Sequence, residues 1–228
     1  MHPSSVTPEA REPLEQFESA PPRFAAALHS LQHVAPRPEI ELDEVPAPLR
    51  TAPYAVAIEG SIAADADAAA DEDFDAFGRI IILYDPEGQA GWHGEFRVVT
   101  TIKASLSPEL NAEPLLTEVA WSWLTDALAG LEIRGLSGTV TQIKSSSFGE
   151  IADDERDSIE IRASWSPGDD NLGSNFAAWM QVLASAAGLE PTDADVTPIN
   201  AAHGSGTGGG HHGHHASHVR NRPRPALV

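Results

Sequence analysis

Histidine is the most reactive type of side chain in this sequence, because the chain contains no cysteine. His29, His33 and His93 lie in its central part, and His93 is followed closely by Glu95 and Arg97. A histidine near carboxylates can transfer protons, so the region around His93 is the candidate for a dispersed catalytic site. The sequence has no Gly-x-Ser-x-Gly elbow, no Walker-type lysine loop and no His-Glu-x-x-His motif, and the catalytic residues stay unknown.

A second group of histidines, near the end of the chain, has the composition of a metal chelator. Four of them stand close together, at His211, His212, His214 and His215. Neutral imidazoles on a flexible chain can bind Zn²⁺, Ni²⁺ or Cu²⁺. We therefore predict weak metal binding by these four residues.

Two other patterns resemble ligand sites but lack the required context. The acidic run between Asp65 and Asp75 has alanine at the sixth and twelfth positions, Ala70 and Ala76, where a calcium loop needs glycine and glutamate. Residues 208–213 satisfy G-x-G-x-x-G, but they follow no predicted strand and open no predicted helix. We expect no cofactor.

Charge is the strongest global feature of this chain of 228 residues. It has 14 basic and 34 acidic residues, a formal net charge of -20. Such a surface repels phosphate backbones, so we expect no direct binding to nucleic acid, and a protein is the expected kind of partner. No apolar stretch is long enough to span a membrane, and the first residues show no signal peptide. The expected location is the cytoplasm.

Composition divides the chain into one domain and two tails. Residues 1–22 are polar and interrupted by prolines, and residues 192–228 are rich in glycine and histidine. Segments with so little to bury cannot offset the entropy of folding, and we predict that both tails are disordered. A single domain is expected at residues 23–191, with an acidic insert at 63–77 that forms a loop or a loose helix.

Periodic patterns within this domain predict helices and strands. Apolar residues at helical spacing predict helices at 24–34, 114–128 and 176–187. Alternation or short apolar runs predict strands at 56–62, 80–84, 96–106, 139–144 and 159–165, with 80–84 and 96–106 forming an antiparallel hairpin. The acidic, proline-rich segment 39–53 is expected to be an extended strap outside the sheet.

This order of elements favours an α+β fold. We expect an antiparallel sheet of about five strands with two or three helices packed on one face, because that arrangement buries the apolar side of both layers. Trp123, Trp165 and Trp179 fall on apolar faces and are predicted to lie in the core. Trp121 points elsewhere on its helix: it is either exposed as an anchor for a partner, or packed under the strap 39–53.

Several short motifs occur in an order that matches a known family. They include Pro36-Arg-Pro-Glu39, Leu83-Tyr-Asp-Pro86, Trp92-His-Gly-Glu-Phe-Arg97, Trp121-Ser-Trp-Leu-Thr125, Ser137-Gly-Thr-Val-Thr141 and Ile161-Arg-Ala-Ser-Trp-Ser-Pro167. Over residues 23–190 the chain resembles the actinobacterial domain of unknown function family 3000. The resemblance implies a small soluble intracellular protein. It brings no activity, cofactor or catalytic residue.

Three hypotheses of function follow from the sequence. The first is a non-catalytic interaction or regulatory module, which agrees with the high negative charge and the missing nucleophile motifs. The second is an enzyme with a dispersed site near His93, Glu95 and Arg97, which requires a cavity at His93. The third is metal binding by the histidine-rich tail.

Overall fold

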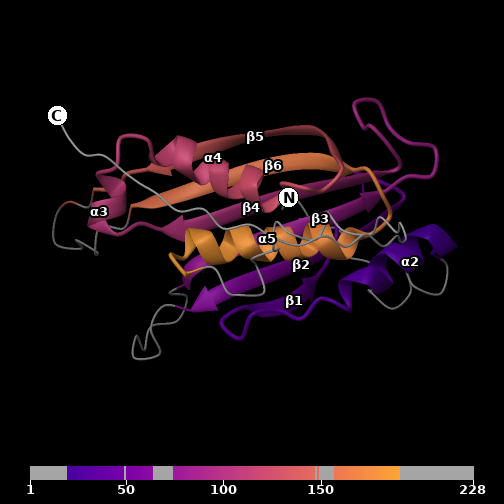
Figure 1. Ribbon diagram of the computed structural model, residues 1–228, viewed down its shortest axis with the longest axis horizontal. Helices are drawn as coiled ribbons and strands as arrows, with labels where there is room; N and C mark the ends of the chain where they lie inside the picture. Colours follow the sequence, from indigo (N-terminus) through magenta and orange to yellow (C-terminus); the bar gives the residue numbers. More distant parts are fainter. Residues whose placement is uncertain (1–19, 49, 64–73, 147, 149–156, 191–228) are drawn as a thin grey trace, which may run out of the picture. The chain divides into compact units, whose positions relative to one another are not determined.

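The computed structural model describes residues 20–48, 50–63, 74–146, 148 and 157–190, which all belong to one compact unit within Met1–Asp195. Its helices and strands are shown in Figure 1. The strands are β1 (Glu41–Val45), β2 (Tyr54–Ala63), β3 (Phe74–Tyr84), β4 (Phe96–Ser105), β5 (Ile133–Ile143) and β6 (Ser158–Pro167). The helices are α2 (Pro22–Leu31), α3 (Pro108–Asn111), α4 (Leu116–Ala127) and α5 (Leu172–Ala186).

The six strands form one sheet in the order β1-β2-β3-β4-β6-β5, and every neighbouring pair is antiparallel. Helices α4 and α5 pack on one face of it, and α2 packs against α5, with Phe24 against Tyr54 and Tyr84 at the end of the sheet (Figure 1). The predicted α+β fold is therefore confirmed, with one strand more than the five expected.

The extra strand is β1, and the prediction that 39–53 is a strap outside the sheet is wrong at this point. Glu41 pairs with Ser61 and Val45 pairs with Ala57, so β1 is the edge strand beside β2. Its acidic side chains face water on a free edge, where charge discourages pairing with other chains. Charge and prolines thus marked an edge strand rather than a segment outside the sheet.

Other predicted boundaries also shift. Strand β3 begins at Phe74, within the segment predicted as a loop or loose helix, and β5 begins at Ile133 rather than at residue 139. The short helix α3 was not predicted, and its first turn is capped by the Ser107 hydroxyl, which accepts from the Leu110 backbone N–H at 3.3 Å. The antiparallel hairpin of β3 and β4 is confirmed.

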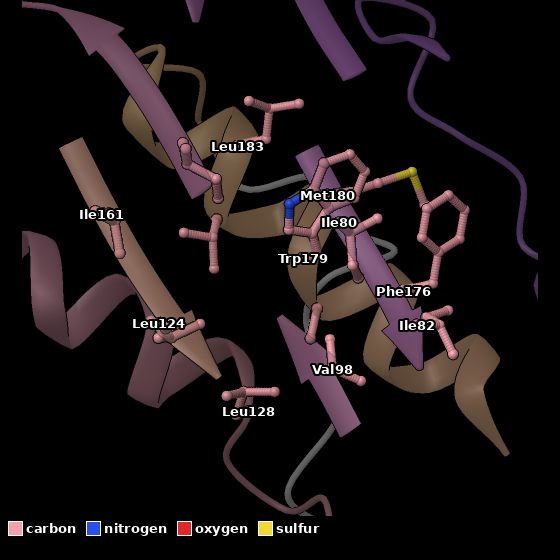
Figure 2. Packing of buried hydrophobic residues seen from close by; sticks show 14 of the residues in the cluster. Ile80, Ile82, Val98, Leu124, Leu128, Ile161, Phe176, Trp179, Met180 and Leu183 are labelled. Carbon is pink, nitrogen blue, oxygen red and sulfur yellow. The ribbon is translucent and has the colours of Figure 1, made fainter. Parts of the chain in front are cut away.

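The core forms where the apolar side of the sheet meets α5. Gly60 of β2 and Gly78 of β3 are paired neighbours, and they leave room for the fully buried indole of Trp179. A Cβ atom on Gly60 would stand 2.8 Å from the Trp179 ring. Figure 2 shows Trp179 beside Ile80 among the other buried side chains. Two glycines thus set how closely α5 approaches the sheet.

The tryptophans test the predicted core directly. Trp165 and Trp179 are fully buried, as predicted, and the Trp165 indole N–H donates to Asn175 Oδ1 at 2.7 Å, which ties β6 to α5. Trp123 is only partly buried against the core. Trp121 lies over Gly138 of β5, where a Cβ atom would stand 2.8 Å from its ring. It therefore packs at the sheet edge opposite the one that holds β1, and the strap alternative is wrong.

The second face of the sheet, on which no described helix packs, carries the alternate residues of each strand. On β4, Phe96 and Val98 point to the helices and are buried, whereas Arg97 and Lys103 lie on this second face. Both faces are accessible at the end of the sheet where β3 and β6 finish and β4 and β5 begin.

Candidate functional site

A cavity of about 670 Å³ opens at this end of the sheet. Its walls come from the connection between β3 and β4, the start of β5, the connection between β6 and α5, and the first turn of α2. The ionisable residues that line it are Arg23, Glu87, His93, Glu95, Arg134, Asp169 and Asp170. Sequence reasoning pointed to His93 and Glu95 among these, and the structure brings five others to the same cavity.

The connection between β3 and β4 is held in place by hydrogen bonds at both ends. The Asp85 backbone N–H donates to Glu95 O at 2.9 Å, and the Gln89 side chain donates to Thr51 O at 3.1 Å. The His93 backbone N–H donates to Ser166 Oγ on β6 at 3.3 Å. These contacts fix the loop against β6 and against the segment that precedes β2.

Arg23 organises one wall of the cavity. Its Nε and Nη2 atoms donate to the two carboxylate oxygens of Asp170, both at 2.7 Å, and its Nη1 lies 2.6 Å from Glu95 Oε1. The Tyr84 hydroxyl donates to the other Glu95 oxygen at 3.1 Å. The hydrogen bond to Asp170 raises the pKa of Arg23 above its ordinary value, and burial raises the pKa of Tyr84. This wall is a closed ionic network of four residues.

Arg97 lies beside His93 at Gly135, on the second face of the sheet, and does not itself line the cavity. Its Nη2 donates to Ser164 Oγ at 2.6 Å, and its Nη1 donates to Gly135 O at 3.2 Å and Ser166 Oγ at 3.4 Å. In the described part of the chain no carboxylate forms an ion pair with it. Burial lowers the pKa of Arg97, because removing water disfavours its charged form.

Gly135 lets His93 and Arg97 come together. The register of β5 against β6 shifts between Arg134 and Ser137, which makes a β-bulge, and Gly135 within it has φ +59°. A Cβ atom there would stand 2.5 Å from His93 Cδ2 and 3.3 Å from Arg97 Nη1. A glycine inside a strand often marks a bulge, but the strand predicted from the sequence began at residue 139, so Gly135 lay outside it and the bulge was not predicted.

The structure brings His93, Glu95 and Arg97 to the same end of the sheet, but they do not form one cluster. Glu95 belongs to the Arg23 network, and Arg97 bonds to two serines and a carbonyl. The cavity at His93 satisfies the condition set by the enzyme hypothesis, which stays a hypothesis. The predicted metal ligands His211, His212, His214 and His215 lie outside the described residues, and that prediction also stays a prediction.

Comparison with known proteins gives one match. The family model described as Protein of unknown function (DUF3000) covers residues 20–197. The chain belongs to the DUF3000 family. The matched span includes every wall of the cavity, so the DUF3000 domain contains the whole site. No curated protein and no solved structure matches the chain.

Two other findings bear on what this DUF3000 domain binds. Among residues 20–190, as far as they are described, no group of three or more histidine, aspartate or glutamate side chains could hold a metal ion. None of the helices described there has the length and apolar character needed to cross a bilayer.

Proposed function

We propose that this DUF3000 domain is a non-catalytic interaction module and that the cavity at the end of its sheet is the recognition site. The observation that carries the proposal is the Arg23 network. Asp170 uses both carboxylate oxygens to hold Arg23, and Glu95 uses one for Arg23 and one for the Tyr84 hydroxyl. Carboxylates held in this way are poorly suited to act as a general base, which needs an oxygen directed at the substrate.

The same network favours binding in another respect. Arg23 lies in the first turn of α2, Glu95 ends the loop before β4, and Asp170 precedes α5, so one guanidinium joins three separate segments. A recess whose walls are fixed in advance loses less conformational entropy when it binds. The expected partner is a protein, since the net charge of -20 disfavours nucleic acid. We place this interaction in the cytoplasm.

Site-specific photocrosslinking tests the proposal. A photoreactive amino acid replaces Ala90, which is exposed and lines the cavity, and in a control chain it replaces Ala129, which is exposed outside it. We expect a specific protein to crosslink from position 90 and not from position 129. Equal crosslinking from both positions, or none from position 90, would contradict an interaction site here.

The enzyme hypothesis makes a different prediction in the same experiment. His93 lines the cavity and is exposed, which is the observation that favours this alternative. A module returns its purified partner with unchanged mass after incubation, whereas an enzyme changes it. A change in the intact mass of the partner that disappears in His93→Ala would favour the enzyme.

Metal binding by the tail is a separate proposal, supported by the composition of residues 211–215. Removal of residues 203–218 is expected to abolish nickel or zinc affinity of the full chain. Unchanged affinity would exclude the tail as the metal site.

A further inference from the structure

Within the part of the chain that the structure describes, the hydrogen-bond partners of the Arg97 cation are all neutral. Its three hydrogen bonds end on two serine hydroxyls and one backbone carbonyl. Arg23, which lines the cavity, is instead held by two carboxylates, Glu95 and Asp170. A partly buried guanidinium without a counter-ion has lost part of its hydration and received no opposite charge in return, so an anion placed beside it would be strongly favoured.

Two other side chains near Gly135, those of His93 and Arg134, also favour an anion. The His93 ring packs with Arg97 against Gly135, and Arg134 lines the same cavity as His93. Arg134 pairs with Glu132 at 2.8 Å, but both side chains are more than half exposed, and an ion pair of this kind contributes little and opens readily. Arg134 is therefore a second cation, next in sequence to Gly135, whose carbonyl accepts from Arg97.

The two serines add hydrogen-bond donors. A hydroxyl can accept from one group while it donates its own proton to another. Ser164 Oγ and Ser166 Oγ accept from Arg97, and neither hydroxyl donates a hydrogen bond among the described residues. Ser164 is only half-buried, so its proton is available to a ligand that reaches Arg97.

The bulge in β5 makes this arrangement possible. It turns the carbonyl of Gly135 toward Arg97, and the missing side chain leaves space for the imidazole. Bulges are frequent beside binding sites because they redirect side chains locally. Here the bulge brings the imidazole and the guanidinium onto one glycine.

We propose that Arg97, His93, Arg134 and the Ser164 hydroxyl form an oxyanion site at the edge of the cavity. His93 and Arg134 line the cavity, and Arg97 and Ser164 lie next to them on the second face of the sheet, so the site binds a carboxylate or a phosphate group of the ligand that extends past His93. This inference rests on the proposed function and specifies its ligand chemistry. The planar guanidinium matches the oxygen geometry of both groups. Protein partners present carboxylates through acidic side chains and their C-terminus, and small metabolites or modified residues present phosphates.

The test is a titration of the full chain with inorganic phosphate and, separately, with acetate, followed by backbone amide NMR shifts. We expect the amides of Gly135 and His93 to shift with a common saturation curve, and the tighter of the two probes identifies the group. Arg97→Gln is expected to weaken the binding of that probe roughly tenfold or more, because the substitution removes a charged hydrogen-bond donor. Arg162→Gln is the matched control, because Arg162 is an exposed arginine on the same face of the sheet, paired with Glu160 at 2.9 Å.

The outcomes separate this inference from the proposed function. Equal weakening by Arg97→Gln and Arg162→Gln, or no saturable shift at Gly135 with either probe, would overturn the oxyanion site. Weaker binding by Arg97→Gln must not come from loosening of the bulge. The unfolding midpoints of Arg97→Gln and Arg162→Gln are therefore measured, and the titration is carried out under conditions in which both variants are fully folded. If crosslinking from position 90 persists unchanged in Arg97→Gln, the recess binds its partner without an oxyanion and only this inference fails. If the wild-type chain gives no crosslink, the proposed function fails by itself.

Discussion

Two arginines at one end of the sheet have opposite surroundings. Arg23 contacts Asp170 through two hydrogen bonds and Glu95 through a third contact, all within 2.7 Å. Arg97 has hydrogen bonds of 2.6–3.4 Å, and among the described residues they all end on neutral oxygens. The first holds segments of the protein together by compensated charge, and the second keeps a charge that its surroundings do not compensate. The difference separates an arginine that stabilises the cavity wall from an arginine beside the cavity that is suited to bind a ligand.

The largest effect is expected from Gly135→Ala, because the new Cβ atom would displace the His93 ring that packs beside Arg97. An alanine in the left-handed region costs about 1–2 kcal/mol of unfolding free energy. Gly130→Ala is the matched control, because Gly130 has φ +87° and a Cβ atom there would meet nothing within 4 Å. Both variants should lose similar stability in urea unfolding, but only Gly135→Ala displaces His93 and should lose phosphate or acetate affinity. Equal phosphate or acetate affinities in the two variants would contradict the role of Gly135 in placing His93 beside Arg97.

A smaller effect is expected from Tyr84→Phe, which removes one hydrogen bond from the Arg23 network. Losing the hydrogen bond to Glu95 should cost about 1 kcal/mol near neutral pH. The pKa of Tyr84 is raised by burial, so the folded state holds this proton more tightly than the unfolded state. The stabilisation is complete below about pH 10, the ordinary pKa of tyrosine, and is lost as the pH rises through the higher pKa of the folded state.

The measurement is the unfolding free energy of wild type and Tyr84→Phe on both sides of about pH 10. The advantage of the wild type should shrink at the higher pH. Tyr54→Phe serves as control, since Tyr54 lies in the same aromatic cluster with its ring centroid 6.1 Å from that of Tyr84. A pH dependence equal in wild type and Tyr84→Phe would show that this hydroxyl does not sense the network.

The smallest effect is expected for the ion pair of Arg23 and Asp170. Their side chains are 47% and 44% exposed, and solvent screens such a pair, so a double-mutant cycle of Arg23→Gln and Asp170→Asn should give a coupling of about 0.5–1 kcal/mol. Added salt should reduce it. The cycle of Arg162→Gln and Glu160→Gln on β6 gives a reference for an ion pair outside the cavity. A coupling no larger than this reference would mean that Arg23 adds little to the wall.

Local patterns predicted the parts of the fold that they control. Strand β4 alternates buried and less buried residues along its length, and that alternation was visible in the sequence. Strand β1 could not be recognised in the same way, because carboxylates on an edge strand reflect its free edge rather than burial.

The candidate site was predicted only in part, for a related reason. His93 and Glu95 are neighbours in the sequence, and their residue types marked the region. Arg23 and Asp170 are 147 positions apart, and neither belongs to a motif, so only the fold reveals their contact. Gly135 also carried no usable signal, because glycine indicates a bulge only within a β pattern, and the predicted strand began at residue 139.

The strand order has a consequence for how the chain folds. Strands β2, β3 and β4 follow each other in both sequence and space, and β5 pairs with β6, so each half of the sheet can form from nearby segments. The pairing of β4 with β6 joins Val98 to Trp165 across a long stretch of chain. Because closing a long loop costs entropy before any contact is gained, we expect this pairing to be the late, slow step of folding. Trp165, fully buried where the halves meet, is a natural fluorescent reporter of that step.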